Sequence, residues 1–367
     1  MTVPTLRIFP PLLLLLIILL ITACDDMTDK TVPVGAVPYE EGSGRLYILS
    51  EGLYSSNNSY LAYYDFDTKT IALDWFGVIN QRKLGDTAND LGIYGNKLYI
   101  VMNTAGIIEV VDKESGRSVG QIPVKNENGR SREPRSIAFH KGFAYVCSFD
   151  NTVAEIDTAS LQVKRLTTAG RNPDGITVAN DKIYVSNSGG LSNPAYDSTV
   201  SVIDPVSFRE IKRITVGHNP YTLKANSKGQ LFVVTRGNYG AQGYRLHRID
   251  TATDRYEKEV EGLHPLNFTL RNDTLWMYSY NFTTGSNDFQ QYDSRNDQLI
   301  TNNFITDNTP IRIPYGISAH PRNGDIFVVD TPFGFSTRGD VLCFSADGKL
   351  KYRLKSVGVN PNKVVAE

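Results

Sequence analysis

Residues 180–223 read NDKIYVSNSGGLSNPAYDSTVSVIDPVSFREIKRITVGHNPYTL. Three short apolar stretches, residues 183–185, 199–203 and 211–216, alternate with turn-forming residues. β-Branched residues between Asn, Asp, Gly and Pro are typical of antiparallel strands. Pro205 ends the second stretch, because proline cannot donate to a strand ladder. A Gly-His-Asn-Pro corner at residues 217–220 then leads into a fourth strand. The stretch therefore predicts a small antiparallel sheet.

The whole chain repeats this unit seven times. The strand that resembles Ile183-Tyr184-Val185 begins at residues 46, 98, 144, 183, 231, 275 and 326, so successive starts lie 52, 46, 39, 48, 44 and 51 residues apart. Propeller blades of four strands repeat at roughly 40–50 residues. The second strand of each unit leads to an acid, and the corner recurs before each following unit. The acids are Asp65, Asp112, Asp157, Asp204, Asp250, Asp293 and Asp347, and the corners are Asp86 to Asp90, Glu133-Pro134, Asn172-Pro173, Asn219-Pro220, His264-Pro265, Ile313-Pro314 and Asn360-Pro361.

The two ends of the repeat array predict how the ring closes. Residues 357–365, VGVNPNKVV, repeat the pattern VGHNPYTL of residues 216–223, yet no further unit follows them. The first unit, in turn, begins at Leu46 without such a strand before it. We therefore expect an all-β, seven-bladed β-propeller over residues 44–367, closed by the C-terminal strand joining the first blade. Length alone would allow two domains, but seven similar units without a linker favour one ring.

Residues 1–23 predict a targeting segment rather than part of the fold. An unbroken apolar run covers residues 12–21, which is too short for the roughly 20 residues that cross a bilayer. It ends at Ile21-Thr22-Ala23-Cys24, which resembles a bacterial lipobox. The resemblance implies a lipoprotein signal peptide and acylation of Cys24, and more than one acyl chain would hold the protein on a membrane. An ordinary secretory signal that contains a cysteine is the alternative.

The residues after Cys24 bear on localisation. Asp25-Asp26 resembles the signal that sends lipoproteins of Bacteroidetes to the outer face of the outer membrane, whereas in other bacteria an Asp here would indicate the inner membrane. Residues 24–43 carry two prolines and little apolar periodicity, which predicts the lipidated Cys24 and a flexible tether. We expect an outer-membrane, cell-surface-exposed, lipid-anchored protein.

Composition and cysteine usage narrow the class further. With 41% hydrophobic residues, 20 Tyr and 16 Phe, the chain can fill a large core. Its 38 Lys and Arg balance 39 Asp and Glu, for a net charge of -1, so no nucleic-acid surface is expected. Cys147 and Cys343 fall in the third and seventh units, which are not neighbours in a ring. They are expected to be two buried thiols rather than a disulfide.

One face of the predicted ring gathers long loops of unusual composition. They join the first and second strands of each unit and lie beside the corners. Aromatic rings beside Asn, Arg and Tyr hydroxyls suit a large, flat ligand that bears amides or hydroxyls. The alternative is that Asn, Asp and Gly simply serve the turns. The predicted ligand contacts are Asn103, Asn187, Arg236, Asn238, Tyr239, Tyr278, Tyr280, Tyr315 and Phe333.

Catalytic motifs are weak in this sequence. His218 and His264 occupy equivalent corners of consecutive units, but no further ligand spacing accompanies them, so no metal site is expected. No Gly-x-Ser-x-Gly, His-Glu-x-x-His or phosphate-loop motif occurs. Nothing pairs the carboxylates Glu51, Asp90, Asp174 and Asp330 as a glycosidase requires. We expect a non-catalytic binding protein without a cofactor.

The repeat resembles the surface-layer (YVTN/YncE-like) propeller repeat. The matching residues are Tyr184-Val185-Ser186-Asn187, Val200-Ser201-Val202-Ile203-Asp204 and Val216-Gly217-His218-Asn219-Pro220. The opening is similar to that of Bacteroidetes surface propeller lipoproteins, a group that includes the BtuG cobalamin-binding proteins; its residues are Ser50-Glu51-Gly52, Asn57-Asn58-Ser59-Tyr60-Leu61-Ala62-Tyr63-Tyr64-Asp65 and Asp86-Thr87-Ala88-Asn89-Asp90-Leu91.

The resemblance implies a function as well as a fold. It implies a protein that captures cobalamin or a related corrinoid and passes it to a TonB-dependent outer-membrane transporter similar to BtuB. Other members of this broad group bind other ligands, so the ligand is the weaker part of the expectation. The alternatives are a propeller hydrolase, such as a metal-dependent lactonase, and a surface module that binds glycans or proteins.

Overall fold

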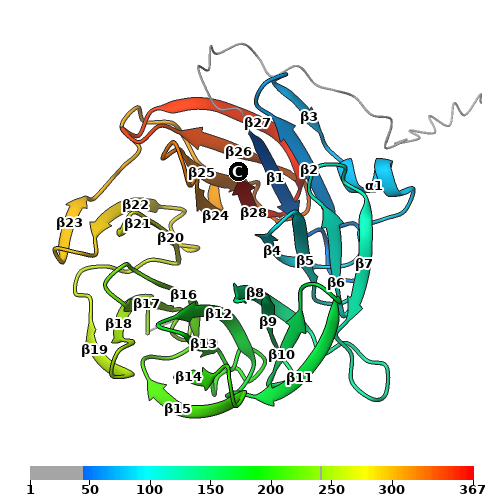
Figure 1. Cartoon of the computed structure of the whole chain (residues 1–367). Helices are drawn as coiled ribbons and strands as arrows, with labels where there is room; N and C mark the ends of the chain where they lie inside the picture. Colours follow the sequence, from blue (N-terminus) through cyan, green and yellow to red (C-terminus); the bar gives the residue numbers. More distant parts are fainter. Residues whose placement is uncertain (1–43, 240–241) are drawn as a thin grey trace, which may run out of the picture.

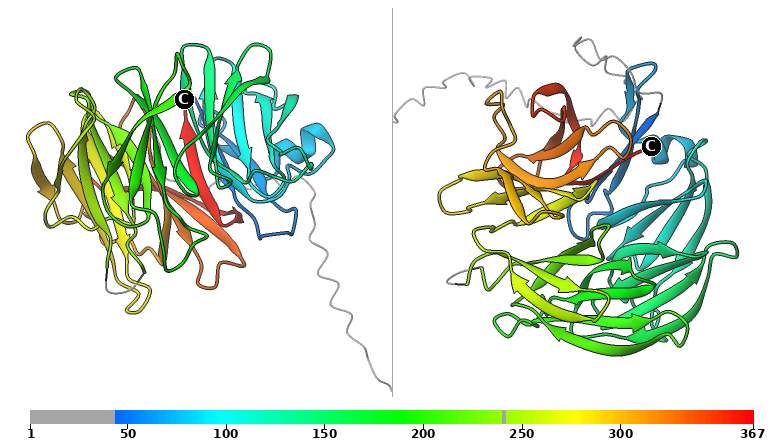
Figure 2. Two further views of the ribbon diagram at one scale, coloured as in Figure 1. Left: turned by 90° about the horizontal axis from the view of Figure 1, so that it is seen from below. Right: turned by 60° about the vertical axis from the view of Figure 1, so that its left-hand side comes forward.

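The computed structural model describes residues 44–239 and 242–367. The predicted signal peptide, the lipidation site Cys24 and the tether lie outside the described residues. Figure 1 shows seven four-stranded antiparallel sheets arranged as blades around one axis. The predicted seven-bladed β-propeller is confirmed. Seen edge-on at the left of Figure 2, the strands run between two faces on which the connections gather.

The seven blades are numbered in chain order, and each is given from its innermost to its outermost strand. Blade 1 holds β28 (Pro361–Ala366), β1 (Arg45–Ser50), β2 (Tyr60–Asp65) and β3 (Thr70–Ala72); blade 2 holds β4 (Ala88–Tyr94), β5 (Lys97–Met102), β6 (Ile107–Asp112) and β7 (Ser118–Pro123); blade 3 holds β8 (Pro134–His140), β9 (Phe143–Ser148), β10 (Thr152–Asp157) and β11 (Gln162–Thr168). Blade 4 holds β12 (Pro173–Ala179), β13 (Lys182–Asn187), β14 (Thr199–Asp204) and β15 (Arg209–Thr215); blade 5 holds β16 (Pro220–Ala225), β17 (Gln230–Thr235), β18 (Arg245–Asp250) and β19 (Arg255–Glu259). Blade 6 holds β20 (Asn267–Arg271), β21 (Thr274–Tyr280), β22 (Asn287–Asp293) and β23 (Gln298–Thr301); blade 7 holds β24 (Ile313–Ala319), β25 (Ile326–Thr331), β26 (Arg338–Phe344) and β27 (Leu350–Val359).

Strand β28 closes the ring as predicted. It pairs antiparallel with β1, with Leu46 opposite Ala366 and Ile48 opposite Val364. In Figure 1 the C-terminal end of the chain lies beside β1. An open sheet edge exposes unpaired amides and carbonyls, and this pairing covers the inner edge of β1.

The recurring acids hold the turns between the third and fourth strands of the blades. The carboxylate of Asp65 accepts the amide hydrogen of Thr68 at 2.8 Å, and that of Asp157 accepts the amide of Ser160 at 2.7 Å. Asp side chains stabilise such turns by replacing a backbone acceptor. These bonds lower the pKa of both carboxyl groups. The acid thus recurs in the repeat because it holds the turn, and no catalytic role is needed to explain it.

The repeated aromatic residue of each second strand fills the space between blades. Tyr47, Tyr99 and Tyr184 are buried, and each hydroxyl donates to a backbone carbonyl of the next blade. The acceptor of Tyr47 is Lys113 at 2.8 Å, and that of Tyr184 is Thr251 at 3.2 Å. A buried hydroxyl needs such a partner. The same side chain thus provides apolar contact and a polar link between neighbouring sheets.

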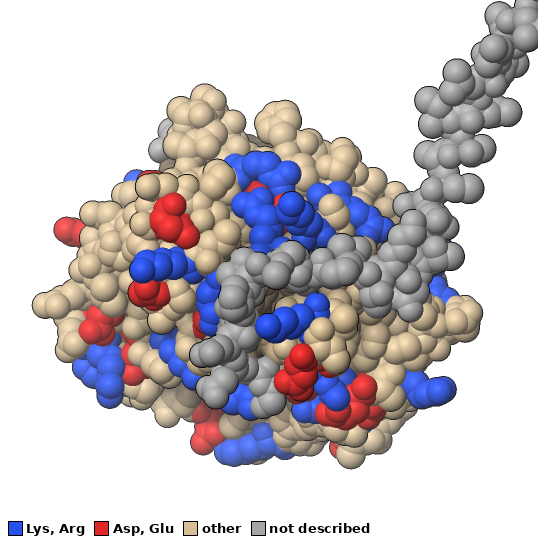
Figure 3. Space-filling model, turned by 90° about the horizontal axis from the view of Figure 1, so that it is seen from above, with Lys and Arg blue, Asp and Glu red and all other residues tan. Residues whose placement is uncertain are grey.

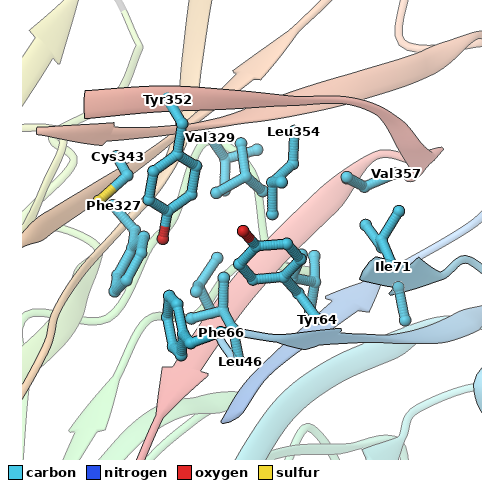
Figure 4. Close-up of a cluster of buried hydrophobic side chains, with 14 residues drawn as sticks. Leu46, Tyr64, Phe66, Ile71, Phe327, Val329, Cys343, Tyr352, Leu354 and Val357 are labelled. Carbon is cyan, nitrogen blue, oxygen red and sulfur yellow. The ribbon is translucent and has the colours of Figure 1, made fainter. Parts of the chain in front are cut away.

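Apolar clusters between blades form the core. Figure 4 shows the cluster at the junction of the first and last blades, where the rings of Tyr64 and Tyr352 lie 5.8 Å apart. Cys343 belongs to this cluster, and Cys147 is buried elsewhere. Both are free thiols, as predicted, and burial raises the pKa of each.

One short helix interrupts the all-β pattern. Helix α1 (Trp75–Asn80) lies in the connection from blade 1 to blade 2, and its Trp75 and Phe76 are buried against the neighbouring core. The carboxylate of Asp74 caps it by accepting the amide of Gly77 at 3.0 Å. Within the described part of the chain, no helix is long and apolar enough to cross a membrane.

Candidate functional site

The inner strands line a central channel of about 640 Å³, which lies on the ring axis. We call the face that carries the long loops and the corners the loop face, and the opposite face the turn face. The channel is lined at the loop face by residues such as Glu51 and Tyr239, and further along the inner strands by residues such as Ser318 and Ala366. Pockets for small molecules commonly have volumes of this size.

A β-bulge at the start of six of the seven inner strands points one residue of each of those blades at the axis. In blade 3 the register shifts between Pro134 and Ser136, which leaves Arg135 without a paired partner residue. The same shift occurs in blades 1, 2, 4, 5 and 7. Bulges re-aim side chains in this way. The bulge residues are Asn89, Arg135, Asp174, Tyr221, Tyr315 and Asn362. In blade 6, where β20 pairs without a shift, Leu266 takes the corresponding place after the corner proline. All seven residues line the channel.

The corner that precedes each bulge explains the recurring Asn-Pro pair. Asn172, Asn219 and Asn360 have positive φ angles of 45°, 59° and 49°. Among residues other than glycine, Asn tolerates this left-handed conformation best. The next residue, proline, begins the inner strand at a position where its missing amide hydrogen costs no ladder bond. The corner therefore fixes where the bulge falls.

Two glycines allow the inner strands to approach closely. A Cβ at Gly175 would lie 2.3 Å from the Tyr221 carbonyl oxygen, and one at Gly316 would lie 2.5 Å from the Asn362 carbonyl oxygen. Each glycine directly follows a bulge residue, Asp174 in one blade and Tyr315 in another. No side chain fits there, so the mouth of the channel depends on glycine at these two positions.

Arg135 organises one side of the mouth. Its Nε donates to the Asp174 carboxylate at 2.8 Å, and one terminal nitrogen donates to Asn89 Oδ1 at 3.0 Å. Its guanidinium carbon also lies 4.4 Å from the centroid of the Phe149 ring. Charge-assisted bonds and ring stacking together fix the direction of this side chain. Asp174 is therefore a paired carboxylate.

Arg236 occupies another part of the mouth without such a partner. Its guanidinium carbon lies 3.3 Å from the centroid of the Tyr221 ring. Its Nε is buried, and no described residue accepts a hydrogen bond from it. The rings of Tyr239 and Tyr278 line the same channel, Tyr278 being buried and Tyr239 58% exposed. A cation stacked on one ring and flanked by two more offers both charge and flat apolar area.

Glu51 and Tyr315 form a third polar group at the mouth. The Tyr315 hydroxyl donates to the Glu51 carboxylate at 2.8 Å, across the junction of blades 7 and 1. Burial raises the pKa of Glu51, although the bond from Tyr315 and the charges of Arg135 and Arg236 oppose that shift. Burial and the nearby Glu51 also raise the pKa of Tyr315 well above its ordinary value.

Below the mouth, the channel contains two lysines. Lys363 Nζ lies 2.9 Å from the Asp90 carboxylate, and the other oxygen of Asp90 accepts the amide of Ile137 at 3.1 Å. Lys224 lines the same channel, and no described residue forms an ion pair or hydrogen bond with its ammonium group. Burial and the charge of Lys363 lower the pKa of Lys224 to about 8.

Four of the residues predicted as ligand contacts line the channel: Arg236, Tyr239, Tyr278 and Tyr315. The structure does not bring the other five to the channel wall. Asn187 is fully buried, and its amide bonds the Gly170 amide, Thr199 and Ser201. Asn103 is buried and donates to the Pro134 carbonyl. These two amides hold the loops together instead of facing a ligand, because the turns themselves need their hydrogen bonds.

The remaining three predicted contacts lie in the loops beyond the channel. Asn238 is exposed, and its Oδ1 accepts the amide of Gln242 at 3.0 Å. Tyr280 is buried against Phe282, with ring centroids 4.8 Å apart. Phe333 is 90% exposed on the loop between β25 and β26. From these loops, the neighbouring residues Tyr239 and Phe282 reach the channel lining.

Sequence reasoning missed three cations of the channel and one ring at its mouth. Arg135, Lys224, Lys363 and Tyr221, all of which line the channel, were not among the predicted contacts. The sequence did carry a signal for Arg135 and Tyr221. Each directly follows a corner proline, and the residue at this place points at the axis. Lys224 lies three residues after Tyr221 in blade 5. Only the register of the bulge shows that the Lys224 side chain also faces the channel.

His218 and His264 do not assemble a metal centre with other side chains. His264 Nδ1 lies 3.1 Å from the Tyr244 carbonyl oxygen and 3.4 Å from an Arg245 nitrogen. Across residues 44–239 and 242–367, no group of three or more His, Cys, Asp or Glu side chains is placed to hold a metal ion. Figure 3 shows basic and acidic side chains interspersed on one side of the molecule.

The family model for a domain of unknown function, DUF5074, matches residues 44–355, which is nearly all of the ring. The chain belongs to the DUF5074 family. None of the curated proteins matches this DUF5074 chain in sequence.

Solved structures share the fold of this DUF5074 protein. A quinonprotein alcohol dehydrogenase-like protein from Bacteroides thetaiotaomicron matches with a TM-score of 0.66 and 14% identity, covering 88% of this chain and 78% of that one. Hydrazine synthase of Kuenenia stuttgartiensis matches with a TM-score of 0.56 and 17% identity, over 69% and 74% of the two chains. The computationally designed Ika8 protein matches with a TM-score of 0.55 and 13% identity, over 88% and 90%. At these identities the likeness concerns the fold alone.

Proposed function

We propose that this DUF5074 protein is a non-catalytic, surface-anchored binding protein that captures cobalamin or a related corrinoid at the mouth of its channel. One observation carries the proposal: the bulges of the inner strands gather two amides, two tyrosines and an arginine from separate blades around one opening. Rigid sheets hold this opening, so little conformational entropy is lost when a ligand binds there.

The chemistry of the mouth suits a corrinoid. Corrinoids carry amides around the edge of a wide, flat ring, and amides both donate and accept hydrogen bonds. Asn362 Oδ1 is a buried acceptor without a partner among the described residues, and Asn89 and Asn267 also line the channel. Tyr239 and Phe282 lie at the loop face with 58% and 59% of their surface exposed, so both rings are available for stacking.

Size decides how such a ligand would lie. A corrinoid is larger than the channel of about 640 Å³. Only a peripheral side chain of the ligand would therefore enter the channel, while the macrocycle lies across the mouth on the exposed rings. This pose uses the polar groups of the channel for orientation and the aromatic residues for contact area.

The proposed anchor is compatible with transfer to a partner. The described chain enters blade 1 at the turn face, opposite the mouth, because β1 runs antiparallel to β28. The 20 residues from 24 to 43 could span at most about 70 Å when extended. A tether of this length allows the mouth to face either the medium or a TonB-dependent transporter in the same membrane, to which the ligand is handed on.

The alternatives of a metal-dependent lactonase and of a module that binds glycans or proteins have no specific observation in their favour. A direct test separates them from the proposal. The purified protein is mixed with cyanocobalamin, and the absorbance of the corrinoid is followed on a sizing column, with and without a chelator. Co-elution that a chelator does not change supports corrinoid capture. Free elution of the corrinoid, or chelator-sensitive turnover of a lactone, would overturn it.

A further inference from the structure

Arg236 is a hydrogen-bond donor at the mouth that lacks an acceptor. Its guanidinium group stacks on Tyr221, 3.3 Å from the ring centroid, and no described residue accepts a hydrogen bond from its buried Nε. The other arginine of the mouth, Arg135, bonds Asp174 at 2.8 Å. A buried donor without an acceptor is unusual in native proteins and requires an explanation. A group of the bound ligand can supply the acceptor.

Glu51 occupies the same position of the repeat as Arg236, in another blade. Glu51 directly follows β1 of blade 1, and Arg236 directly follows β17 of blade 5. The backbone amide of each donates to the carbonyl of a corner asparagine, Glu51 to Asn360 and Arg236 to Asn219, both at 2.9 Å. The repeat therefore places the two residues at the same level of the ring, and both line the channel.

The Glu51 carboxylate has room for a further donor. The Tyr315 hydroxyl donates to its Oε2 at 2.8 Å, and no described donor bonds its Oε1. The charge of Arg236 opposes the rise in the pKa of both Glu51 and Tyr315, so the arginine lies within electrostatic reach of this pair. Within the described chain, however, no hydrogen bond or ion pair joins Arg236 to Glu51. A ligand group between them would meet a donor on one side and an acceptor on the other.

The surrounding charges favour a neutral group at this point. An anion that Arg236 attracts is repelled by Glu51 and by the nearby Asp174. A cation that Glu51 attracts is repelled by Arg135 and Arg236. A primary carboxamide carries no charge, accepts hydrogen bonds at its oxygen and donates them at its nitrogen. An ester or ketone accepts only, and would leave Oε1 of Glu51 without a donor.

We infer that Arg236 and Glu51 form a carboxamide subsite at the mouth of the channel, in which the amide oxygen accepts from the guanidinium group and the amide nitrogen donates to the carboxylate. The subsite rejects the corresponding carboxylate, which lacks the donor and repels Glu51. It deepens the proposed function and rests on it only for the identity of the whole ligand. Within a corrinoid, the peripheral side-chain amides are the groups that fit the subsite.

Three aromatic probes of similar size test the subsite without any corrinoid. Benzamide is neutral, benzoate is an anion and benzylammonium is a cation, and the ring of each can lie on the exposed rings of Tyr239 and Phe282. The full-length chain in detergent micelles is titrated calorimetrically with each probe at about pH 8, where carboxyl groups are ionised, and empty micelles serve as the blank. We expect benzamide to bind about tenfold more tightly than either charged probe. Binding without a preference for benzamide, or binding of none of the three probes, would overturn the subsite.

Conservative substitutions then assign the effect to the two side chains. Glu51→Gln keeps an acceptor oxygen and removes the charge, so benzoate should bind about tenfold more tightly than it binds the wild type. Arg236→Lys keeps the charge and removes the Nε donor, so benzamide should bind about tenfold more weakly. Glu257→Gln and Arg209→Lys change exposed residues on outer strands and should keep the wild-type affinities. A Glu51→Gln variant that still rejects benzoate, or an Arg236→Lys variant that binds benzamide normally, contradicts the subsite.

Cyanocobalamin separates a failure of the subsite from a failure of the proposed function. If it binds, and Arg236→Lys weakens it together with benzamide, both proposals hold. If it binds wild type and variant equally and no preference for benzamide is found, the corrinoid proposal holds and the subsite is wrong. If it does not bind, while the preference for benzamide depends on Arg236 and Glu51, the subsite holds and the corrinoid proposal is wrong.

Discussion

The guanidinium carbon of Arg236 lies 3.3 Å from the centre of the Tyr221 ring. Tyr221 lies on β16 and Arg236 directly follows β17, the neighbouring strand of the same blade, so the sheet brings the two side chains together. The stack fixes the plane of the guanidinium group while its edge still faces the channel. A flat, positively charged surface results at the mouth of the ring.

Removing this arginine and its exposed neighbour should impair ligand capture. The double variant Arg236→Ala, Tyr239→Ala loses one polar contact and one ring, each worth about 1 kcal/mol. We expect corrinoid affinity to fall at least about tenfold in a calorimetric titration. The control is Arg209→Ala, Ile211→Ala on the exposed outer strand β15, which should bind normally. Unchanged affinity in the channel variant would place the ligand elsewhere.

Strand β28 should contribute strongly to stability. Val364 of this strand is 3% exposed within the cluster that joins the first and last blades. Val364→Ala removes buried methyl groups and leaves a cavity, so it should lower the free energy of unfolding by about 2 kcal/mol in a urea titration. Val119→Ala, at a half-exposed position of β7, should change it by less than about 0.5 kcal/mol. A similar decrease of the free energy of unfolding in both variants would contradict a strong contribution of β28 to stability.

Acid should destabilise the protein partly through His247. Burial lowers the pKa of His247 to about 4, and its Nε2 lies 2.9 Å from Thr235 Oγ1. In the unfolded chain His247 binds a proton near pH 6.5, whereas in the folded chain it does so only near pH 4. The free energy of unfolding therefore falls as the pH drops from about 6.5 to 4. In His247→Gln the free energy of unfolding should fall by roughly 3 kcal/mol less than in the wild type over this pH interval. His218→Gln, at an exposed corner, is the control and should keep the wild-type slope in urea titrations at each pH.

Lys224 should reduce the stability of the ligand-free protein. Its folded pKa of about 8 lies below the ordinary 10.5, so between these values the unfolded chain holds a proton that the folded chain has released. Stability should therefore rise with pH from about 8 to 10.5. Lys224→Met should remove this rise and stabilise the protein at pH 7 by about 2 kcal/mol, as measured by urea unfolding. A variant that is less stable than wild type at pH 7 would contradict this account.

Thiol counting should test both the core and the anchor. Cys147 and Cys343 are fully buried, and burial raises their pKa values, so neither should react with a thiol reagent in the folded protein. If Cys24 is lipidated through its sulfur, protein isolated from membranes should expose two reactive thiols after unfolding in urea. Protein made without acylation should expose three. Three in the membrane-derived protein would rule out lipidation of Cys24.

The fold was predictable because each blade repeats the same local requirements. The blades share an acid at a turn, an aromatic ring between blades and, at most corners, a proline, and each leaves a residue pattern at a fixed place in the repeat. Even the closing strand was predictable, since residues 357–365 carry an inner-strand pattern without a blade to follow. Helix α1 was not predicted, because it occurs in a single connection and has no counterpart in the repeat.

The site was only partly predictable. Composition pointed to the loop face, and four of the residues that it singled out, Arg236, Tyr239, Tyr278 and Tyr315, line the channel. Asn187 shows the limit of that reasoning: a turn uses its amide internally, and sequence alone does not say whether an amide faces inward or outward. Lys224 was missed because its direction depends on a bulge three residues earlier, and a shift of one position turns a side chain to the other face of a strand.

The closing strand also sets the order in which this protein can mature. Strand β1 is synthesised before the other strands described here, whereas its inner neighbour β28 is synthesised after all the other blades. Until β28 is made, the incomplete ring carries an unpaired strand edge, and a nonsense codon at position 361 would leave six complete sheets beside one that invites pairing with another molecule. Chaperones and proteases would therefore meet this chain chiefly through its first blade.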